Sequence, residues 1–289
     1  MTPAPSVIIF TVFSGMGFGY LALLALVQTY SGTAALAHWA VGYALAVVGL
    51  AASAFHLGNP ARAWRAFTQW RSSWLSREAW GAVLALLVLA PVALSDWLGL
   101  GLPRGLGWLG AALALATIVA TGMNYAQIRA VPRWHHRSVP VLFLAFAFAG
   151  GSLLAGARDL SLVALLVLGG MMVLHWRVGD GAFARAGSTM GTATGLGGLG
   201  QVSVFEPAHT AGNYLLREMI FVVGRRHVPK LRVLALGFGV VLPLLAMLLL
   251  PGRYGPYVAL PLHLLGAFAQ RWLFFAQAEH VVGLYYGKR

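Results

Sequence analysis

The residues best suited to chemistry lie in one polar stretch, residues 56–78, of an otherwise apolar chain. It begins with His56 and ends with Glu78. An imidazole and a carboxyl group can each hydrogen-bond to an oxygen atom and take up or release a proton. Arg71 and Arg77 lie between them, and guanidinium groups stabilise negative charge. The sequence therefore predicts proton and anion chemistry at this stretch.

One further charged residue, Arg271, lies inside an apolar segment that spans residues 257–276. It comes about fourteen residues into that segment, which is roughly 20 Å of helix rise. An unpaired charge there is costly, so the side chain must face the interior of a helix bundle or extend to the membrane surface. Glu279 follows too far along the chain to be a partner on the same helix. We therefore expect a partner for Arg271 on another helix.

The composition is that of an integral membrane protein. Hydrophobic residues make up 59% of the chain and charged residues 9%, whereas charged residues make up about 25% of an ordinary soluble domain. The net charge of +13 is spread over short clusters between apolar runs, which argues against nucleic-acid binding, because that function gathers basic residues on one folded face. The chain has no cysteine, so a disulfide or a cysteine-ligated iron–sulfur cluster must belong to a partner.

Eight apolar segments have lengths close to the ~20 residues that a helix needs to cross a bilayer. They are residues 6–29, 39–57, 80–98, 106–127, 139–157, 160–176, 231–250 and 257–276. Backbone groups in lipid must bond within the segment, so runs of this length indicate helices, not barrel strands. The first segment lacks a basic region before it and is longer than the core of a signal peptide, so we expect it to be retained. The predicted fold is an all-α integral membrane protein: one membrane domain, residues 1–289, with eight transmembrane helices in one bundle.

The basic residues predict the orientation of this bundle. Sixteen of them lie after the second, fourth and sixth segments or at the carboxyl terminus. Only Arg104, Arg158 and Arg253 lie in the connections on the opposite side. Because positively charged loops stay in the cytoplasm, both termini are predicted to be cytoplasmic. We expect a multi-pass protein of the bacterial inner membrane.

The longest connection, residues 177–230, is predicted to be cytoplasmic. Residues 195–200 match the spacing of a dinucleotide-binding glycine motif, but no strand is expected before them, so a flexible loop is the better interpretation. Residues 213–227 have an apolar body flanked by charge and suit either an interfacial helix or a docking surface for a partner. About fifty residues are too few for a separate redox domain.

Four motifs of this chain resemble those of the membrane anchor subunit of dimethyl sulfoxide reductase and related enzymes. They are His56-Leu-Gly with Pro60, residues 70–78, residues 213–218, and residues 271–276 followed by Tyr285 and Tyr286. The resemblance spans nearly the whole chain and extends to the membrane subunit of a sulfite-oxidising relative. It implies an eight-helix subunit that holds a molybdopterin catalytic subunit and a ferredoxin-like iron–sulfur subunit at the membrane and exchanges electrons with quinones.

The resemblance also implies a quinone site. The quinone-binding residues of the family map onto His56 and Glu78, while Arg71, Arg77 and Arg271 are expected to support the site by stabilising the anionic form of a reduced quinone. The exchangeable substrate is expected to be menaquinone or ubiquinone. No haem and no iron–sulfur cluster is expected in this chain. We expect the site near the cytoplasmic face, between the ends of the second, third and eighth helices.

Each of these residues also has a purely structural interpretation. His56 can be an interfacial histidine bonded to the backbone. Glu78 can be a carboxylate in the first turn of its helix, behind Ser76, where the helix dipole favours negative charge. The arginines can lie beside lipid phosphates.

Two other functions remain as alternatives. A multi-helix transporter would carry polar or broken segments near the middle of the membrane, and Asn124, Gln127 and Pro243 are weak evidence for one. A b-haem anchor needs histidines that face each other across helices. Here His175 and His280 are expected at the cytoplasmic ends of their helices and His263 near an outer end. The sequence leaves open the substrate of the catalytic partner and the direction of electron flow.

Overall fold

The computed structural model describes residues 2–27, 30–206, 211–220 and 223–287. All regular structure within these ranges is helical, which confirms the all-α prediction. Among the described residues, seven helical segments are long and apolar enough to cross a membrane: α1 (Pro5–Val27), α2 (Gly32–Ala54), α3 (Trp74–Leu98), α4 (Arg104–Ala126), α6 (Arg158–Asp180), the continuous segment Val228–Leu249, and α13 (Tyr254–Ala276). The apolar helix α5 (Ser138–Leu154) has 17 residues, fewer than the ~20 that a straight crossing needs. The count of eight transmembrane helices therefore stays a prediction.

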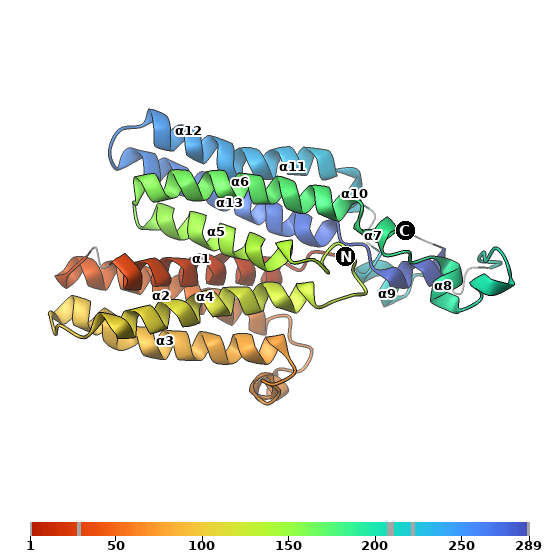
Figure 1. Ribbon diagram of the computed structural model, residues 1–289, viewed down its shortest axis with the longest axis horizontal. Coiled ribbons are helices and arrows are strands. Elements are labelled where there is room, and N and C mark those ends of the chain that lie inside the picture. The colour runs from red at the N-terminus through yellow and green to blue at the C-terminus, as the bar shows by residue number, and fades with distance from the viewer. Residues whose placement is uncertain (1, 28–29, 207–210, 221–222, 288–289) are drawn as a thin grey trace.

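Helix α1 lies at the centre of the bundle and packs against α2, α4, α5 and α13 (Figure 1). Its residues are apolar all round, as expected of a helix buried on every side. Two of its glycines let neighbouring helices come close: a Cβ atom on Gly17 would lie 2.4 Å from the backbone nitrogen of Ala46, and one on Gly19 would lie 2.3 Å from the carbonyl oxygen of Ala147. These two glycines therefore have a packing role. Gly15 has open space beside it.

The segment Val228–Leu249 is not a regular helix. It consists of α11 (Val228–Leu236), a π-helical turn η3 (Gly237–Val241) and α12 (Leu242–Leu249). Pro243 lacks an N–H group and cannot donate to the carbonyl of Gly239 four residues earlier. His263 of α13 fills this role, because its Nδ1 lies 2.8 Å from that carbonyl oxygen. His263 lies near the middle of α13, not near an outer end as the sequence predicted. Its bond to the carbonyl of Gly239 has a structural role.

Both ends of the described chain lie at the same end of the bundle (Figure 1). The connections between α2 and α3, between α4 and α5, and between α6 and α11 lie there too, and they carry the basic clusters. We call this the basic end. The predicted grouping of the termini with the basic connections is thus seen in the fold, whereas the cytoplasmic orientation of this end stays a prediction.

The described part of the connection between α6 and α11 contains four short α-helices and one glycine-rich 3₁₀ turn. They are α7 (Ala182–Arg185), α8 (Met190–Thr194), η2 (Gly197–Leu199), α9 (Tyr214–Glu218) and α10 (Val223–Arg226). In the glycine motif, Gly195 ends α8 with a positive φ of 73°, so it serves as a helix cap and no strand precedes it within the described ranges. Residues 213–227 form two short helices and not one interfacial helix; residues 221–222 of that stretch lie outside the described residues. The carboxyl-terminal turn η4 (Val281–Tyr286) packs against α8, where the hydroxyl of Tyr285 donates to the carbonyl of Ala193 at 2.6 Å.

A candidate site in the polar layer of the bundle

Near the basic end, polar side chains from five helices are buried in an otherwise apolar bundle. We call this set the polar layer. Its buried members are Glu78 of α3, Thr121 of α4, Ser138 of α5, His175 of α6 and Arg271 of α13, and they are joined by Asn124 and Tyr125 of α4, which are partly buried. Each of these residues lies within about two helical turns of the end of its helix, so the layer lies just inside the bundle.

Glu78 is buried on the side of α3 that faces α4, with only 4% of its surface exposed. Ser73 caps α3, because its side chain accepts from the backbone N–H of Ser76, and the helix begins at Trp74. Glu78 is therefore the fifth helical residue. It does not lie in the first turn, so the interpretation of this residue as a helix-terminal carboxylate is wrong.

Both carboxyl oxygens of Glu78 are hydrogen-bonded by neutral donors of α4. The hydroxyl of Thr121 donates to Oε1 at 2.5 Å, and the amide of Asn124 donates to Oε2 at 2.5 Å. Asn124 Oδ1 is buried and has no hydrogen-bond partner among the described residues. A carboxyl group held in this way has a fixed orientation but no cationic partner bonded to it in the described chain. Such a group is suited to gaining and losing a proton.

Arg271 points into the bundle, with 2% of its surface exposed. Its guanidinium carbon lies 3.5 Å from the ring centre of Phe143 and 5.2 Å from that of Phe146, both on α5. The predicted partner on another helix is therefore a pair of aromatic rings, and the side chain does not extend to the membrane surface. Nη1 of Arg271 is buried and has no hydrogen-bond partner among the described residues, so it is free to donate.

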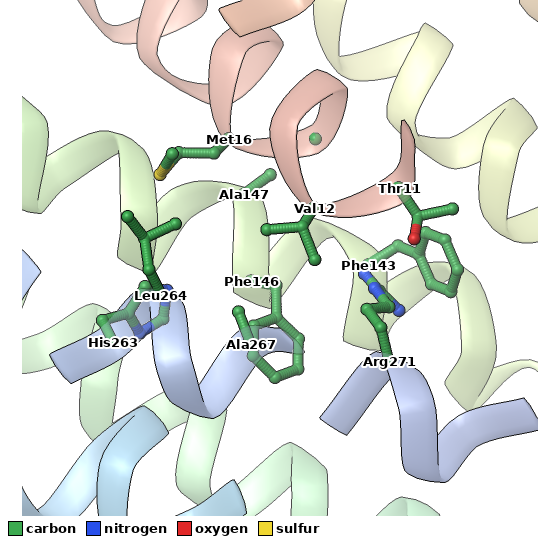
Figure 2. Close-up of a pocket in the computed structure, with 11 residues that line it drawn as sticks. Thr11, Val12, Met16, Phe143, Phe146, Ala147, His263, Leu264, Ala267 and Arg271 are labelled. Atoms are coloured by element: carbon green, nitrogen blue, oxygen red, sulfur yellow. The ribbon is translucent and has the colours of Figure 1, made fainter. Parts of the chain in front are cut away.

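A small cavity between α1, α5 and α13 separates Arg271 from His263, and Thr11 and Met16 of α1 line its other side (Figure 2). Its volume is about 10 Å³, close to what one water molecule needs. The cavity cannot hold a quinone head group. It can hold a water molecule that hydrogen-bonds to the free guanidinium nitrogen.

Tyr125 connects the two buried charged residues. It interacts electrostatically with both Glu78 and Arg271. Its ring packs edge to face on Phe274 at 5.3 Å and lies 5.7 Å from Phe143. Helix α13 packs against α1, α5 and the segment Val228–Leu249, whereas α3 packs against α2 and α4. The two charges thus belong to one layer but lie on helices with different packing partners.

The other three predicted residues lie at the surface. Helix α2 ends at Ala54, and His56 lies exposed in the turn that follows, where partial desolvation lowers its pKa below the ordinary value. Arg77 is also exposed. Its Nε donates to the carbonyl of Trp70 at 3.0 Å and its Nη2 to the carbonyl of Arg71 at 2.7 Å. These bonds hold the connection before α3 in shape.

The prediction from sequence therefore included the two buried charges but missed their neighbours. Thr121, Asn124 and Tyr125 have the spacing i, i+3 and i+4, which places them on one face of a helix. That spacing is the sequence signal that places Thr121 and Tyr125 beside Asn124 on one face of the helix. The sequence analysis names Asn124 alone, as weak evidence for a transporter.

Comparisons with known proteins identify the family. The model of the DMSO reductase anchor subunit (DmsC) family matches residues 2–178. The C subunit of sulfite dehydrogenase from Allochromatium vinosum is 32% identical over 322 aligned positions, which cover 99% of each chain. The chain belongs to the DMSO reductase anchor subunit family. The resemblance seen in the sequence is confirmed, and with its apolar helices the chain is a multi-pass membrane subunit of an oxidoreductase complex.

The family match covers His56, Arg71, Arg77 and Glu78 but ends before α13. Arg271 is covered by the alignment with the sulfite dehydrogenase protein, which extends over nearly the whole chain.

Proposed function

We propose that this chain is the membrane anchor and quinone-reactive subunit of a heterotrimeric molybdopterin oxidoreductase of the dimethyl sulfoxide reductase or sulfite dehydrogenase type. It passes electrons between the quinone pool of a bacterial inner membrane and a ferredoxin-like iron–sulfur subunit. The substrate chemistry takes place in the molybdopterin subunit. Family membership supports this role, and the absence of cysteine in the chain is consistent with metal centres that belong to the partners.

The observation that best supports quinone chemistry is the environment of Glu78. A carboxyl group is buried among apolar helices, is oriented by Thr121 and Asn124, and has no bonded cation in the described chain. Burial of an ionised carboxylate is costly because the group loses its hydration, and the ionisable residues that membrane proteins keep in such positions mark functional sites. Oxidation of a quinol releases two protons and two electrons. Glu78 accepts a proton from the head group and the electrons pass to the iron–sulfur subunit.

The remaining predicted residues fit around this group. Arg271 offers its free Nη1 to a water molecule in the adjacent cavity, and Tyr125 lies near both charges. His56 lies at the surface at the basic end and exchanges protons with water. Arg71 and Arg77 shape the connection before α3 and give the surface a positive charge. With cytoplasmic termini and eight crossings, the basic end is the face on which the iron–sulfur subunit docks.

The test compares two activities of the purified complete complex. Glu78→Gln keeps the shape of the side chain but removes its acid–base function, and we expect quinone-linked turnover to fall on the order of 10²-fold or more. Turnover of the catalytic partner with a soluble artificial electron carrier should be unchanged. Glu206→Gln, on the exposed connection, is the matched control.

If both activities of Glu78→Gln fall together and the complex dissociates, the residue is structural and this site is wrong. Equal quinone-linked rates in the variant and the wild type would also reject the site.

A further inference from the structure

Three side chains form a hydrogen-bonded row that leads from the surface of the basic end into the bundle. His136 lies exposed in the connection between α4 and α5, Ser138 is the buried first residue of α5, and His175 of α6 is 2% exposed. The hydroxyl oxygen of Ser138 lies 3.0 Å from Nδ1 of His136 and 3.0 Å from Nδ1 of His175. Two imidazoles thus share one hydroxyl group.

The backbone fixes the direction of these bonds. The N–H of Ser138 donates to Nδ1 of His136 at 3.0 Å. This nitrogen must carry a lone pair, so the proton of neutral His136 sits on Nε2. The Ser138 hydroxyl then donates to His136 and accepts from Nδ1–H of His175. Every donor in the row points outward, toward the surface.

The inner end of the row reaches the polar layer. The ring of His175 stacks on Phe274 with ring centres 5.9 Å apart, and Phe274 in turn packs on Tyr125. The charged or titratable groups that act electrostatically on His175 are Arg133, Arg232, Arg271 and His136, all basic. A neutral imidazole can take up a proton on one ring nitrogen while it releases a proton from the other, so His175 is suited to passing a proton on.

We propose that His136, Ser138 and His175 form a proton relay between the polar layer and the surface of the basic end. This proposal rests on the proposed quinone function. His175 takes up a proton at Nε2, from the head group or from a water molecule held by Arg271, while its Nδ1 proton moves to the Ser138 oxygen. Ser138 passes its own proton to His136 Nδ1, and His136 releases the Nε2 proton to water.

In one such transfer each group keeps its number of protons. The two electrons of the quinol pass separately to the iron–sulfur subunit. One of its protons goes to Glu78 and the other uses the row. The transfer leaves each imidazole with its proton on the other ring nitrogen, so both rings return to their starting tautomers before the next turnover. The reverse sequence supplies one proton when a quinone is reduced. The alternative is a structural role, in which the two histidines only hydrogen-bond to the Ser138 hydroxyl at the start of α5. The same bonds would then form, but their removal would not slow proton transfer.

The experiment uses the purified complete complex, a soluble short-chain quinol and a soluble artificial electron carrier. Ser138→Ala removes only the shared hydroxyl. We expect kcat with the quinol to fall on the order of 10²-fold, the KM for the quinol to stay the same, and turnover with the artificial carrier to be unchanged. His136→Ala should slow the quinol reaction in the same way. Because His136 is exposed, imidazole in the buffer should restore that rate.

His135→Ala is the control. This neighbouring histidine is also exposed, but its Nδ1 bonds to the carbonyl of Ala126 at 2.7 Å, outside the row. Its quinol-linked rate should match that of the wild type.

Wild-type rates in both Ser138→Ala and His136→Ala would overturn the relay. Loss of turnover with both donors, with no rescue by imidazole, would assign the row a structural role and also overturn it. If the quinol reaction is lost in Glu78→Gln but not in these variants, the proposed function stands and only the relay is wrong. A wild-type complex that does not react with quinones would reject the proposed function itself.

Discussion

The bond between His263 and the carbonyl of Gly239 predicts an energetic coupling between α13 and the π-helical turn. Pro243 leaves that carbonyl without its usual helical donor, and His263 Nδ1 takes the donor's place at 2.8 Å. In His263→Leu the carbonyl is buried and unpartnered. A buried polar group left unpartnered costs about 1–3 kcal/mol, and we expect the free energy of unfolding to fall by about that amount.

The second arm of the experiment changes the helix and not the histidine. Pro243→Ala restores an N–H group four residues after Gly239, so the carbonyl regains a backbone donor. His263→Leu should then cost less in the Pro243→Ala background than in the wild type, with a coupling energy of about 1 kcal/mol or more. The assay is reversible unfolding in mixed detergent micelles, followed by circular dichroism, for the wild type, both single variants and the double variant.

Equal costs of His263→Leu in the two backgrounds would refute this reasoning. They would show that His263 contributes by packing and not by replacing the missing donor.

Three further outcomes follow from the packing and the charges. Gly19→Val should destabilise the bundle by about 1–3 kcal/mol, because the new side chain would overlap the backbone of α5. Gly15 has open space beside it, so Gly15→Val should be better tolerated, and thermal unfolding of the two variants measures the difference. Thr121→Val and Asn124→Leu each remove one hydrogen-bond donor to the carboxyl group of Glu78, so both should lower the quinol-linked rate while turnover with an artificial carrier persists. A normal quinol-linked rate in both variants would contradict the assigned site. Desolvation lowers the pKa of His56 below its ordinary value of 6.5, so the imidazole gains its charge only when the pH falls below that value. Quinol-linked turnover should decline in that acidic range, and the pH profile of His56→Gln should lack the decline.

The helices were predictable because lipid imposes a length and an apolar composition on each of them. Some boundaries were not. Helix α2 begins at Gly32, seven residues before its predicted apolar run, and α3 begins at Trp74, six residues before its run. In α3 the added residues at the basic end are partly polar, and in α2 those at the opposite end are mostly small, so they continue the helix but add little hydrophobicity. The sequence signal for the π-helical turn is a proline alone, because its contact with α13 joins residues far apart in the chain.

Within the site, the sequence indicated which residues were unusual but not what they touch. Arg271 stood out as a charge in an apolar segment, yet its partners are the rings of Phe143 and Phe146, which look like ordinary core residues in the sequence. Glu78 was assigned to the helix start because the polar stretch ends there. The true start at Trp74 places it one turn deeper, where it bonds to α4. Such contacts depend on how helices distant in the chain pack, which no local pattern encodes.

The location of the quinone site is the central claim, and labelling with a photoreactive quinone analogue tests it most directly. The purified complex is irradiated with the analogue, with and without excess unlabelled quinol, and the labelled peptides are identified by mass spectrometry. We predict labels that the competitor removes on the parts of α3, α4 and α13 that carry Glu78, Tyr125 and Arg271. Competed labels confined to the opposite end of the bundle, around Asp96 and Arg104, would contradict the claim.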